Sequence, residues 1–358
     1  MEKIKNILIV VSTLLISACV DDEVPTPDDH FLNYDIPDVP VDQDYIVGAY
    51  YNSFAWDPDM VEVPSAGLYD AQNGDPAAYQ SHIANANTGG IDYFIFGIRS
   101  AVNPAQFTAD SSFVAMLQSA TNASDMNFAL NYNFGAMQLS DNNRIEGKGF
   151  VDDLVADFER MEDLFKLSNY MQVEGKKVVM ISNAANLHSD DNVSLITQVR
   201  SAMSAKGIDL YIIGTQPNWT PPLRYEFRYI DAVDAVSHDS YIRIQQAWYD
   251  RYLLFHNMVD QALTYSQEAL GKHNLEYIPQ ISPSYNGKIL AANNNDVVVE
   301  KNADWFNKYC DIAKRSSSAN RMIIVDSFNN WNQDKQVEPA QSYSDNFLKI
   351  LKDEFKVN

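Results

Sequence analysis

The hydrophobic positions between residues 45 and 358 fall into two alternating kinds of segment. Short runs rich in Val, Ile, Tyr and Phe predict β-strands, whereas apolar residues that recur every three to four positions predict helices. Runs such as KVVMI and RMIIV are almost continuously apolar, which is typical of parallel strands covered on both faces. Eight strands are expected, at residues 46–51, 91–97, 126–132, 177–182, 208–214, 232–238, 276–282 and 321–327.

Helical patterns lie between these strands and after the last one. They are expected at residues 77–88, 108–123, 149–170, 192–206, 246–270, 301–317 and 341–355. The connection after the fifth strand, around PPLRYEFRYI, is short and has no clear helical pattern. Eight strand–helix units in about 310 residues predict an α/β fold, a single (β/α)8 TIM barrel over residues 45–358.

A doubly wound open sheet is the alternative fold for this alternation of strands and helices. It would be favoured by a G-x-G-x-x-G after the first strand or by a G-x-x-x-x-G-K-[ST] segment, and the sequence has neither. It also has no HExxH, no paired Cys/His spacing and no G-x-S-x-G. We therefore expect a barrel that needs no cofactor and no metal.

Residues 1–18 have the character of a targeting segment. Two lysines precede the apolar run ILIVVSTLLI, which is too short to span a membrane as a stable helix. The run closes on ISAC, which resembles a bacterial lipobox and implies a lipoprotein signal peptide with lipidation of Cys19. A secreted signal cleaved near Ala18 is the alternative. The other cysteine, Cys310, lies in a helical pattern and is expected to be a buried core residue.

Residues 19–44 join the lipidated cysteine to the barrel. Positions 20–44 hold nine acidic residues, four prolines and no Lys or Arg, a composition that cannot bury enough apolar surface to fold. We expect a disordered acidic tether. An acidic run directly after a lipidated cysteine also resembles the surface-export signal of Bacteroidota lipoproteins, which implies a cell-surface location on the outer membrane.

The overall charge narrows the choice of partners. The formal net charge is −22, so the surface repels nucleic acid, and no nucleic-acid partner is expected. A neutral ligand such as a sugar is compatible with this charge.

In a barrel of this kind, functional residues gather at the carboxyl ends of the strands. The segments expected there are rich in amides, which exchange hydrogen bonds with hydroxyls, and in aromatic rings, which stack on sugars. Asn and Ser are also ordinary turn residues. His238 beside Asp239 fits either an acid/base pair or a structural histidine. The candidate ligand-binding residues at these strand ends are Trp56, Asn131, Trp219, His238, Tyr241, Tyr285, Asn329, Asn330, Trp331 and Gln333.

The segment SFNNWNQDKQVEPA, at residues 327–340, resembles the signature motif of glycoside hydrolase family 99, the endo-α-mannosidases and endo-mannanases. Weaker matches are VGAYYNSFAWDP, GIDYFIFG, VEGKKVVMIS and IPQISPSYNG, the last of which puts Tyr285 on a ligand-binding Tyr of the family. The resemblance spans about residues 45–350. The residues that match the signature motif are Ser327, Phe328, Asn329, Trp331, Gln336, Glu338, Pro339 and Ala340. The resemblance implies a structural or ligand-binding role for Glu338, because it matches a family residue outside the catalytic pair.

The sequence differs from that family at the positions of the family's catalytic carboxylates. The resemblance puts Asn330 and Gln333 on the two catalytic Glu positions, and Asn131 on a third family Glu. An amide cannot exchange the proton that general acid–base catalysis requires, and each such group contributes about 10² to 10⁴ in rate. It can still bond a hydroxyl. The resemblance therefore implies a cleft that grips a glycan without cleaving it.

Three functional hypotheses follow. The first is a cell-surface glycan-binding lipoprotein, for α-mannan or a related polysaccharide, with an outer-membrane glycan transporter complex as a candidate partner. The second is an endo-acting glycoside hydrolase for mannan-type glycans whose acids have relocated to Asp239, Asp326 or Glu338, with Asp334 also near. The third is a scaffold or adhesin without a glycan ligand.

Overall fold

The computed structural model describes residues 33–57, 60, 62–217, 228, 230–240, 242, 254–291, 293 and 298–357. Its strands are β1 (Ile46–Tyr51), β2 (Tyr93–Arg99), β3 (Asn127–Asn133), β4 (Gln172–Val173), β5 (Lys176–Ile181), β6 (Leu210–Gln216), β7 (Ala235–His238), β8 (Glu276–Ile278), β9 (Gln280–Ile281) and β10 (Met322–Val325). Its α-helices are α2 (Pro76–Thr88), α3 (Pro104–Gln118), α4 (Val151–Arg160), α5 (Glu162–Phe165), α6 (Asn192–Ser204), α7 (Phe255–Gly271), α8 (Ala303–Ser316) and α9 (Asn346–Phe355).

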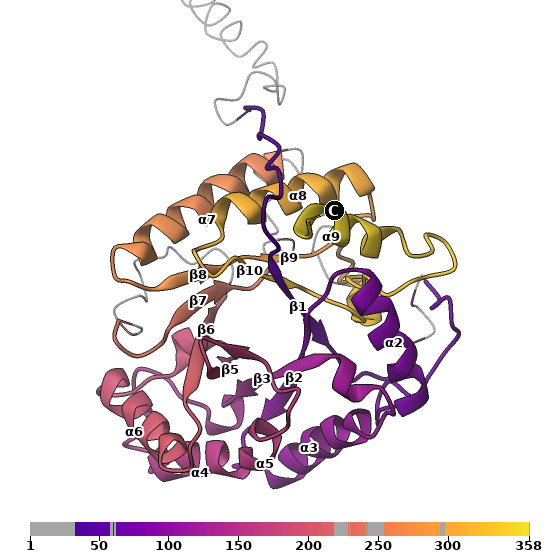
Figure 1. The fold of residues 1–358 in the computed structure, drawn as a ribbon. Coiled ribbons are helices and arrows are strands. Elements are labelled where there is room, and N and C mark those ends of the chain that lie inside the picture. The colour runs from indigo at the N-terminus through magenta and orange to yellow at the C-terminus, as the bar shows by residue number, and fades with distance from the viewer. Residues whose placement is uncertain are drawn as a thin grey trace, which may run out of the picture.

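The strands close into a barrel that the helices surround (Figure 1). The sheet order is β8-β7-β6-β5-β3-β2-β1-β10-β9, and every neighbouring pair in it is parallel. Only Pro279 separates β8 from β9. A proline cannot donate to the ladder, but its carbonyl accepts from the amide of Ile324 at 3.0 Å. Because β8 pairs with β7 and β9 pairs with β10, the two ends of the sheet are one run of chain, and the barrel is closed.

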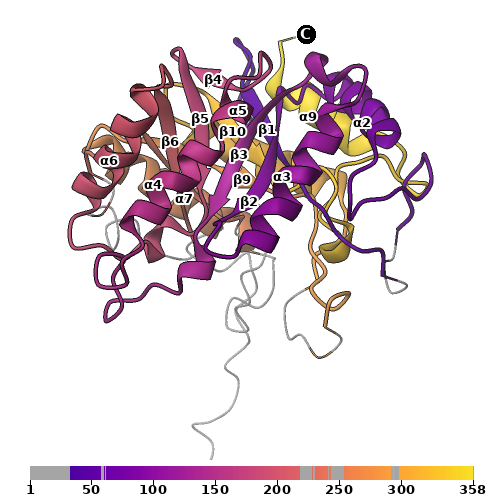
Figure 2. The ribbon, with the colours of Figure 1, turned by 90° about the horizontal axis from the view of Figure 1, so that it is seen from below.

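The (β/α)8 barrel expected from the sequence is therefore confirmed, and the doubly wound alternative is wrong. Figure 2 shows the strands side by side with α3, α4 and α6 outside them. The expected helix at 149–170 is divided into α4 and α5, and the short β4 pairs with β5 as an antiparallel hairpin. Helix α3 begins at Pro104, earlier than expected, because the Asn103 side chain caps it by accepting from the amide of Gln106.

Two apolar cores hold the barrel together. The interior core comes from alternate strand positions, such as Tyr93, Ile95 and Ile324, and the larger outer core lies between the strands and the helices. Gly48 is required inside the barrel because a β-carbon there would lie 2.3 Å from the ring of Tyr93.

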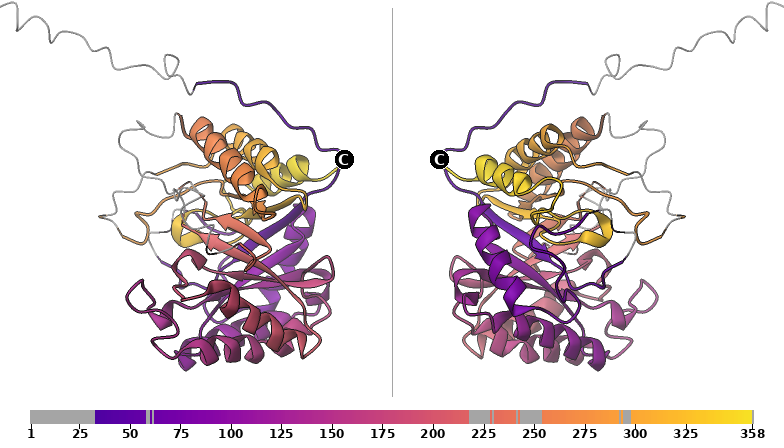
Figure 3. Two further views of the ribbon diagram at one scale, coloured as in Figure 1. Left: turned by 90° about the vertical axis from the view of Figure 1, so that its left-hand side faces the viewer. Right: turned by 90° about the vertical axis from the view of Figure 1, so that its right-hand side faces the viewer.

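An extended segment, residues 33–44, runs along the outside of α8 and α7 (Figure 3). We call it the N-terminal strap. The Tyr34 hydroxyl donates to Asp260 at 2.8 Å, and the Val39 amide donates to Asp311 at 2.9 Å. The Lys314 ammonium donates to the Val39 carbonyl at 2.8 Å. The disorder expected for the tether is thus wrong for residues 33–44, because side chains on the helices bond this segment's backbone and side chains.

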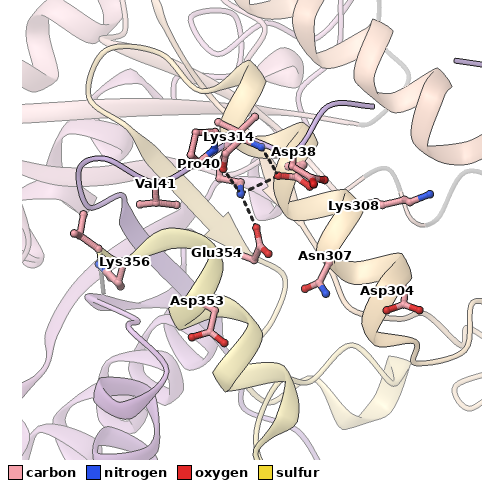
Figure 4. Close-up of a pocket in the computed structure, with 13 residues that line it drawn as sticks. Asp38, Pro40, Val41, Asp304, Asn307, Lys308, Lys314, Asp353, Glu354 and Lys356 are labelled. Atoms are coloured by element: carbon pink, nitrogen blue, oxygen red, sulfur yellow. Dashed lines mark hydrogen bonds and ion pairs between the residues drawn. The ribbon is translucent and has the colours of Figure 1, made fainter. Parts of the chain in front are cut away.

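The strap and helices α8 and α9 line an open cavity of ≈ 960 Å³ (Figure 4). Its buried cation, Lys314, pairs with Asp311 at 2.8 Å and with Glu354 at 2.5 Å. These bonds hold the strap and α9 to α8, so we assign the cavity a structural role.

The signal peptide, Cys19 and the first part of the tether lie outside the described residues, and their assignments stay predictions. Within the described part of the chain, no helix is long and apolar enough to cross a bilayer.

Candidate functional site

The mouth of the barrel lies at the carboxyl ends of the strands. Tyr50, at the end of β1, faces into it, and the Gln280 side chain donates to the Tyr50 hydroxyl at 3.4 Å and to Ser237 at 3.1 Å. Burial raises the pKa of Tyr50 well above its usual value, and the negative charges of Asp239 and Asp326 raise it further. Two carboxylates are therefore close enough to the mouth for their charges to influence this hydroxyl.

Two cavities at this end of the barrel, of ≈ 310 Å³ and ≈ 380 Å³, share Asn133 and Ser182 in their linings. The two cavities adjoin at these residues, and we call them together the rim cleft. Amides and hydroxyls dominate its polar lining. These residues are Asn52, Ser53, Asn131, Asn133, Gln138, Ser182, Asn183 and Asn186.

Two features show that the rim cleft has room and unmet bonding capacity. The Asn131 side-chain oxygen is buried, and no residue that the structure describes donates to it. Gly97 also lines the cleft, and a β-carbon there would meet nothing within 4 Å. A ligand hydroxyl could therefore enter beside Gly97 and donate to Asn131.

The charged groups of the rim cleft are few. Asp110 pairs with Arg99 at 2.6 Å, and Asp239 is an exposed carboxylate on the other side of the cleft. An amide- and hydroxyl-lined cleft with a compensated Arg–Asp pair can bind polyhydroxyl groups by exchanging hydrogen bonds.

The loop after β10 carries the motif that the sequence singled out. Its centre is a 3-10 helix, η10 (Trp331–Gln333). The Asn330 side-chain amide donates to the side-chain oxygen of Gln333 at 3.1 Å, and both residues are half-buried. The two amides that stand three residues apart in the sequence are thus a bonded pair, and neither can supply or remove a proton.

Two buried lysines hold this loop in place. Lys335 pairs with Asp326 at 2.5 Å and lies 5.5 Å from the centre of the Tyr285 ring. Lys301 pairs with Asp334 at 2.5 Å, and burial lowers the pKa of Lys301. Asp326 and Asp334 are therefore carboxylates whose charge is matched by a lysine.

Glu338 lies at the centre of a buried polar network and is only 2% exposed. It accepts from Trp331 Nε1 at 2.7 Å and from the Tyr69 hydroxyl at 2.9 Å, and His82 Nε2 lies 3.1 Å from it. The other ring nitrogen of His82 lies 2.9 Å from the Tyr51 hydroxyl. Burial and the Glu338 charge raise the pKa of Tyr69 well above its usual value. This network joins the loop after β10 to the loop after β1 and to α2.

Several predicted ligand-binding residues prove to be buried supports. Trp331 and Tyr285 are each 1% exposed, so neither ring has a free face on which a sugar could stack. The Asn329 side chain makes two hydrogen bonds with the backbone of Asn52. It accepts from the Asn52 amide at 2.7 Å and donates to the Asn52 carbonyl at 3.1 Å. The stacking role expected for the two aromatic residues is not supported, because loop packing covers both rings.

The other predicted residues take different places. Trp56 is half-buried, and its indole donates to the Tyr69 carbonyl at 2.6 Å. His238 is buried and lies 3.0 Å from the hydroxyl of Tyr277, on the strand face opposite to inward-facing Ser237. Of the two roles open to His238, the structure favours the structural one. Trp219 and Tyr241 lie outside the described residues.

Sequence reasoning missed Tyr50, Arg99, Asp110 and Gln280. Arg99 was missed because the second strand was expected to end at residue 97, two positions too early. Tyr50 and Gln280 lie inside predicted strands, and only the closure of the barrel turns them toward its mouth.

A family model described as Glycosyltransferase WbsX matches residues 145–351, more than half of the chain. The chain belongs to this family. A solved structure named "Glycoside hydrolase-like protein" is 36% identical, with a TM-score of 0.83, over 93% of this chain and 99% of that one. None of the curated proteins matches.

The WbsX-family chain also shares its fold with a "GH99 endo-alpha-mannosidase from Bacteroides thetaiotaomicron". That structure is 13% identical, with a TM-score of 0.60, over 87% of this chain and 98% of that one. An identity this low establishes the fold alone. The chain is thus a glycoside hydrolase-like barrel related in structure to the GH99 enzyme, and the alignment of Asn330 and Gln333 with catalytic positions stays a prediction.

Proposed function

We propose that this protein binds a neutral glycan of the α-mannan type, or a related polysaccharide, at the rim cleft and does not cleave it. The observation that carries the proposal is the cleft's lining of amides and hydroxyls, in which the Asn131 oxygen has no donor among the described residues. An acceptor buried without a partner costs about 1–3 kcal/mol. A ligand hydroxyl that donates to Asn131 would recover that cost.

The amide pair supports binding without hydrolysis. Hydrolysis of a glycosidic bond ordinarily uses two carboxyl groups, one of which protonates the leaving oxygen. Asn330 and Gln333 instead bond to each other at 3.1 Å. They can orient hydroxyls, but they cannot transfer protons.

The proposal is tested by titrating the purified protein with α-mannan oligosaccharides in a calorimeter and, in parallel, by chromatography for released products. We expect saturable binding, no released product, and affinity about 5- to 10-fold lower in Asn131→Ala, the loss of one net hydrogen bond. Asn307→Ala is the matched control, because Asn307 is a half-buried amide beside the strap and away from the cleft (Figure 4).

Two results would overturn this proposal. Equal affinity in the wild type and Asn131→Ala would show that the ligand does not bind at Asn131 in the rim cleft. The absence of binding to any glycan in a broad panel would favour a scaffold or adhesin role instead.

A hydrolase is the second candidate, and one observation favours it. The charges of Asp239 and Asp326 both raise the pKa of the Tyr50 hydroxyl at the barrel mouth, so two carboxylates lie near one point. If they are the relocated acids, the wild type releases oligosaccharides, and Asp239→Asn or Asp326→Asn abolishes the release. Product release that survives in both variants would exclude these two carboxylates as the catalytic pair.

We further propose that the protein is an outer-membrane, cell-surface lipoprotein anchored through Cys19 and that it works beside a glycan transporter complex. The support is the lipobox-like ISAC and the acidic segment that follows it. Cys19→Ala should move the protein from the membrane fraction to the soluble fraction, as measured by fractionation and surface protease accessibility. Retention of that variant on the cell surface would contradict lipid anchoring.

A further inference from the structure

Among the described residues that line the rim cleft, Arg99 at the end of β2 is the one cation. Its side chain is 43% exposed and lines the ≈ 310 Å³ part of the cleft together with Asn131 and Asn133. Arg99 therefore lines the same cavity as the unpartnered acceptor of Asn131 and is open to a ligand.

Asp110 on α3 holds this arginine in one orientation. The Asp110 carboxylate accepts from the Arg99 backbone amide at 2.8 Å, from Nε at 2.8 Å and from Nη2 at 2.6 Å. Its side chain is only 12% exposed, so the acceptor is itself held in place. A guanidinium has five N–H groups. Two of them are used here, and no other described residue accepts from the remaining three.

The free edge of the guanidinium presents parallel donors in a rigid fork. Such a fork fits a pair of oxygens about as far apart as those of a carboxylate or of two neighbouring hydroxyls. The surrounding charge decides between them. Asp110 neutralises Arg99, and the other charged residue that the structure describes in this lining is the carboxylate of Asp239. With a formal net charge of −22 on the whole protein, an anionic ligand is repelled.

We propose that Arg99, fixed by Asp110, determines the specificity of the rim cleft by donating to two adjacent hydroxyls of a neutral sugar. This inference rests on the proposed function. It adds the residue that recognises the ligand, Arg99, and the feature that is recognised, a pair of adjacent hydroxyls on a neutral sugar. The carboxylate of Asp110 lies beside the same ligand and can accept from one of the hydroxyls.

The test compares two conservative variants of the full-length protein. Arg99→Lys keeps the charge but loses the planar fork, and it should lower affinity for α-mannan oligosaccharides about 10-fold or more, since a hydrogen bond to a charged group contributes about that factor. Arg144→Lys is the matched control. Arg144 is 46% exposed and pairs with Asp190 at 2.9 Å, outside the rim cleft.

Two further measurements separate ligand binding from a structural role and a neutral ligand from an anionic one. Both variants should melt close to the wild-type temperature, because lysine keeps the positive charge beside each carboxylate and the two arginine side chains are 43% and 46% exposed. Affinity for the neutral mannan should change little when the salt concentration is raised, whereas binding of polygalacturonate as an anionic probe should be weaker and salt-sensitive.

Each outcome bears on the inference. Unchanged affinity in Arg99→Lys, with weaker binding in Asn131→Ala, would overturn the role of Arg99 and leave the proposed function standing. Tighter, salt-sensitive binding of polygalacturonate by the wild type would overturn the neutral class. Wild-type protein that binds neither probe would refute the proposed function and this inference together.

Discussion

Removing the Glu338 carboxylate should strongly destabilise the loop that carries the amide pair. Three donors converge on this buried side chain, from Trp331 at 2.7 Å, Tyr69 at 2.9 Å and His82 at 3.1 Å. In Glu338→Ala all three lose their acceptor, and water cannot replace it without opening the loop, because Trp331 and His82 are each 1% exposed.

The magnitude follows from these contacts. A buried donor without an acceptor costs about 1–3 kcal/mol. The three donors share one site and relax together, so their costs do not add fully. We therefore expect the free energy of unfolding to fall by about 3–5 kcal/mol in Glu338→Ala, less than the full sum of the three costs. Glu338→Gln should cost about 1–3 kcal/mol, because one acceptor oxygen remains.

Urea denaturation followed by tryptophan fluorescence measures this difference. Glu300→Ala is the control for removal of a surface carboxylate, because Glu300 is exposed, and its effect should stay within about 0.5 kcal/mol. A Glu338→Ala variant that unfolds within about 1 kcal/mol of the wild type would show that the network does not anchor the loop. The same result would imply that the three donors find other acceptors.

Three further predictions test the barrel and its mouth. Gly48→Ala should lower the free energy of unfolding by about 1–3 kcal/mol, since its β-carbon would meet the Tyr93 ring at 2.3 Å; denaturation with no loss would contradict the interior packing. Gly97→Leu should leave stability nearly unchanged but abolish glycan binding, since its side chain enters the open space of the rim cleft; calorimetry showing wild-type affinity would exclude this cleft. Burial lowers the pKa of His256 from 6.5 to about 4, so the unfolded chain takes up the proton first as the pH falls. Stability should therefore be complete above about pH 6.5 and decrease by on the order of 1–3 kcal/mol toward pH 4. His256→Gln should flatten this part of the pH profile, and an unaltered profile would assign the loss to other groups.

Local sequence patterns were sufficient to predict most of the strands and helices and the fold class. The first strand was predicted with its observed bounds, 46–51, because its alternation and its Val and Tyr content leave little choice of conformation. The continuous apolar character of 177–182 and 321–327 indicated strands covered on both faces, which the buried β5 and β10 confirm. The sequence also placed Asn330 and Gln333 three residues apart in one loop, and the structure shows that their side chains bond to each other.

Contacts between segments that are distant in the sequence could not be predicted from these local patterns. The strap looked like a disordered tether because composition carries no information about partners, and Tyr34 finds Asp260 only after α7 has docked on the barrel. Trp331 and Tyr285 looked like stacking residues because an aromatic side chain at a strand end can face either solvent or the core. Packing of the loops over one another buries both rings in the core.

The sequence by itself determined the order of strands and helices, the barrel and the position of the amide-rich loop, because each depends on periodicity and spacing over a few residues. The tertiary structure alone decided which side chains are free to meet a ligand. Glu338 meets His82 across 256 positions of the chain and supports the loop, whereas Arg99, with its partner Asp110 one helix away, keeps donors open in the rim cleft. Burial and hydrogen-bond satisfaction depend on the whole fold, so the sequence alone does not show which polar side chains support the loops and which can meet a ligand.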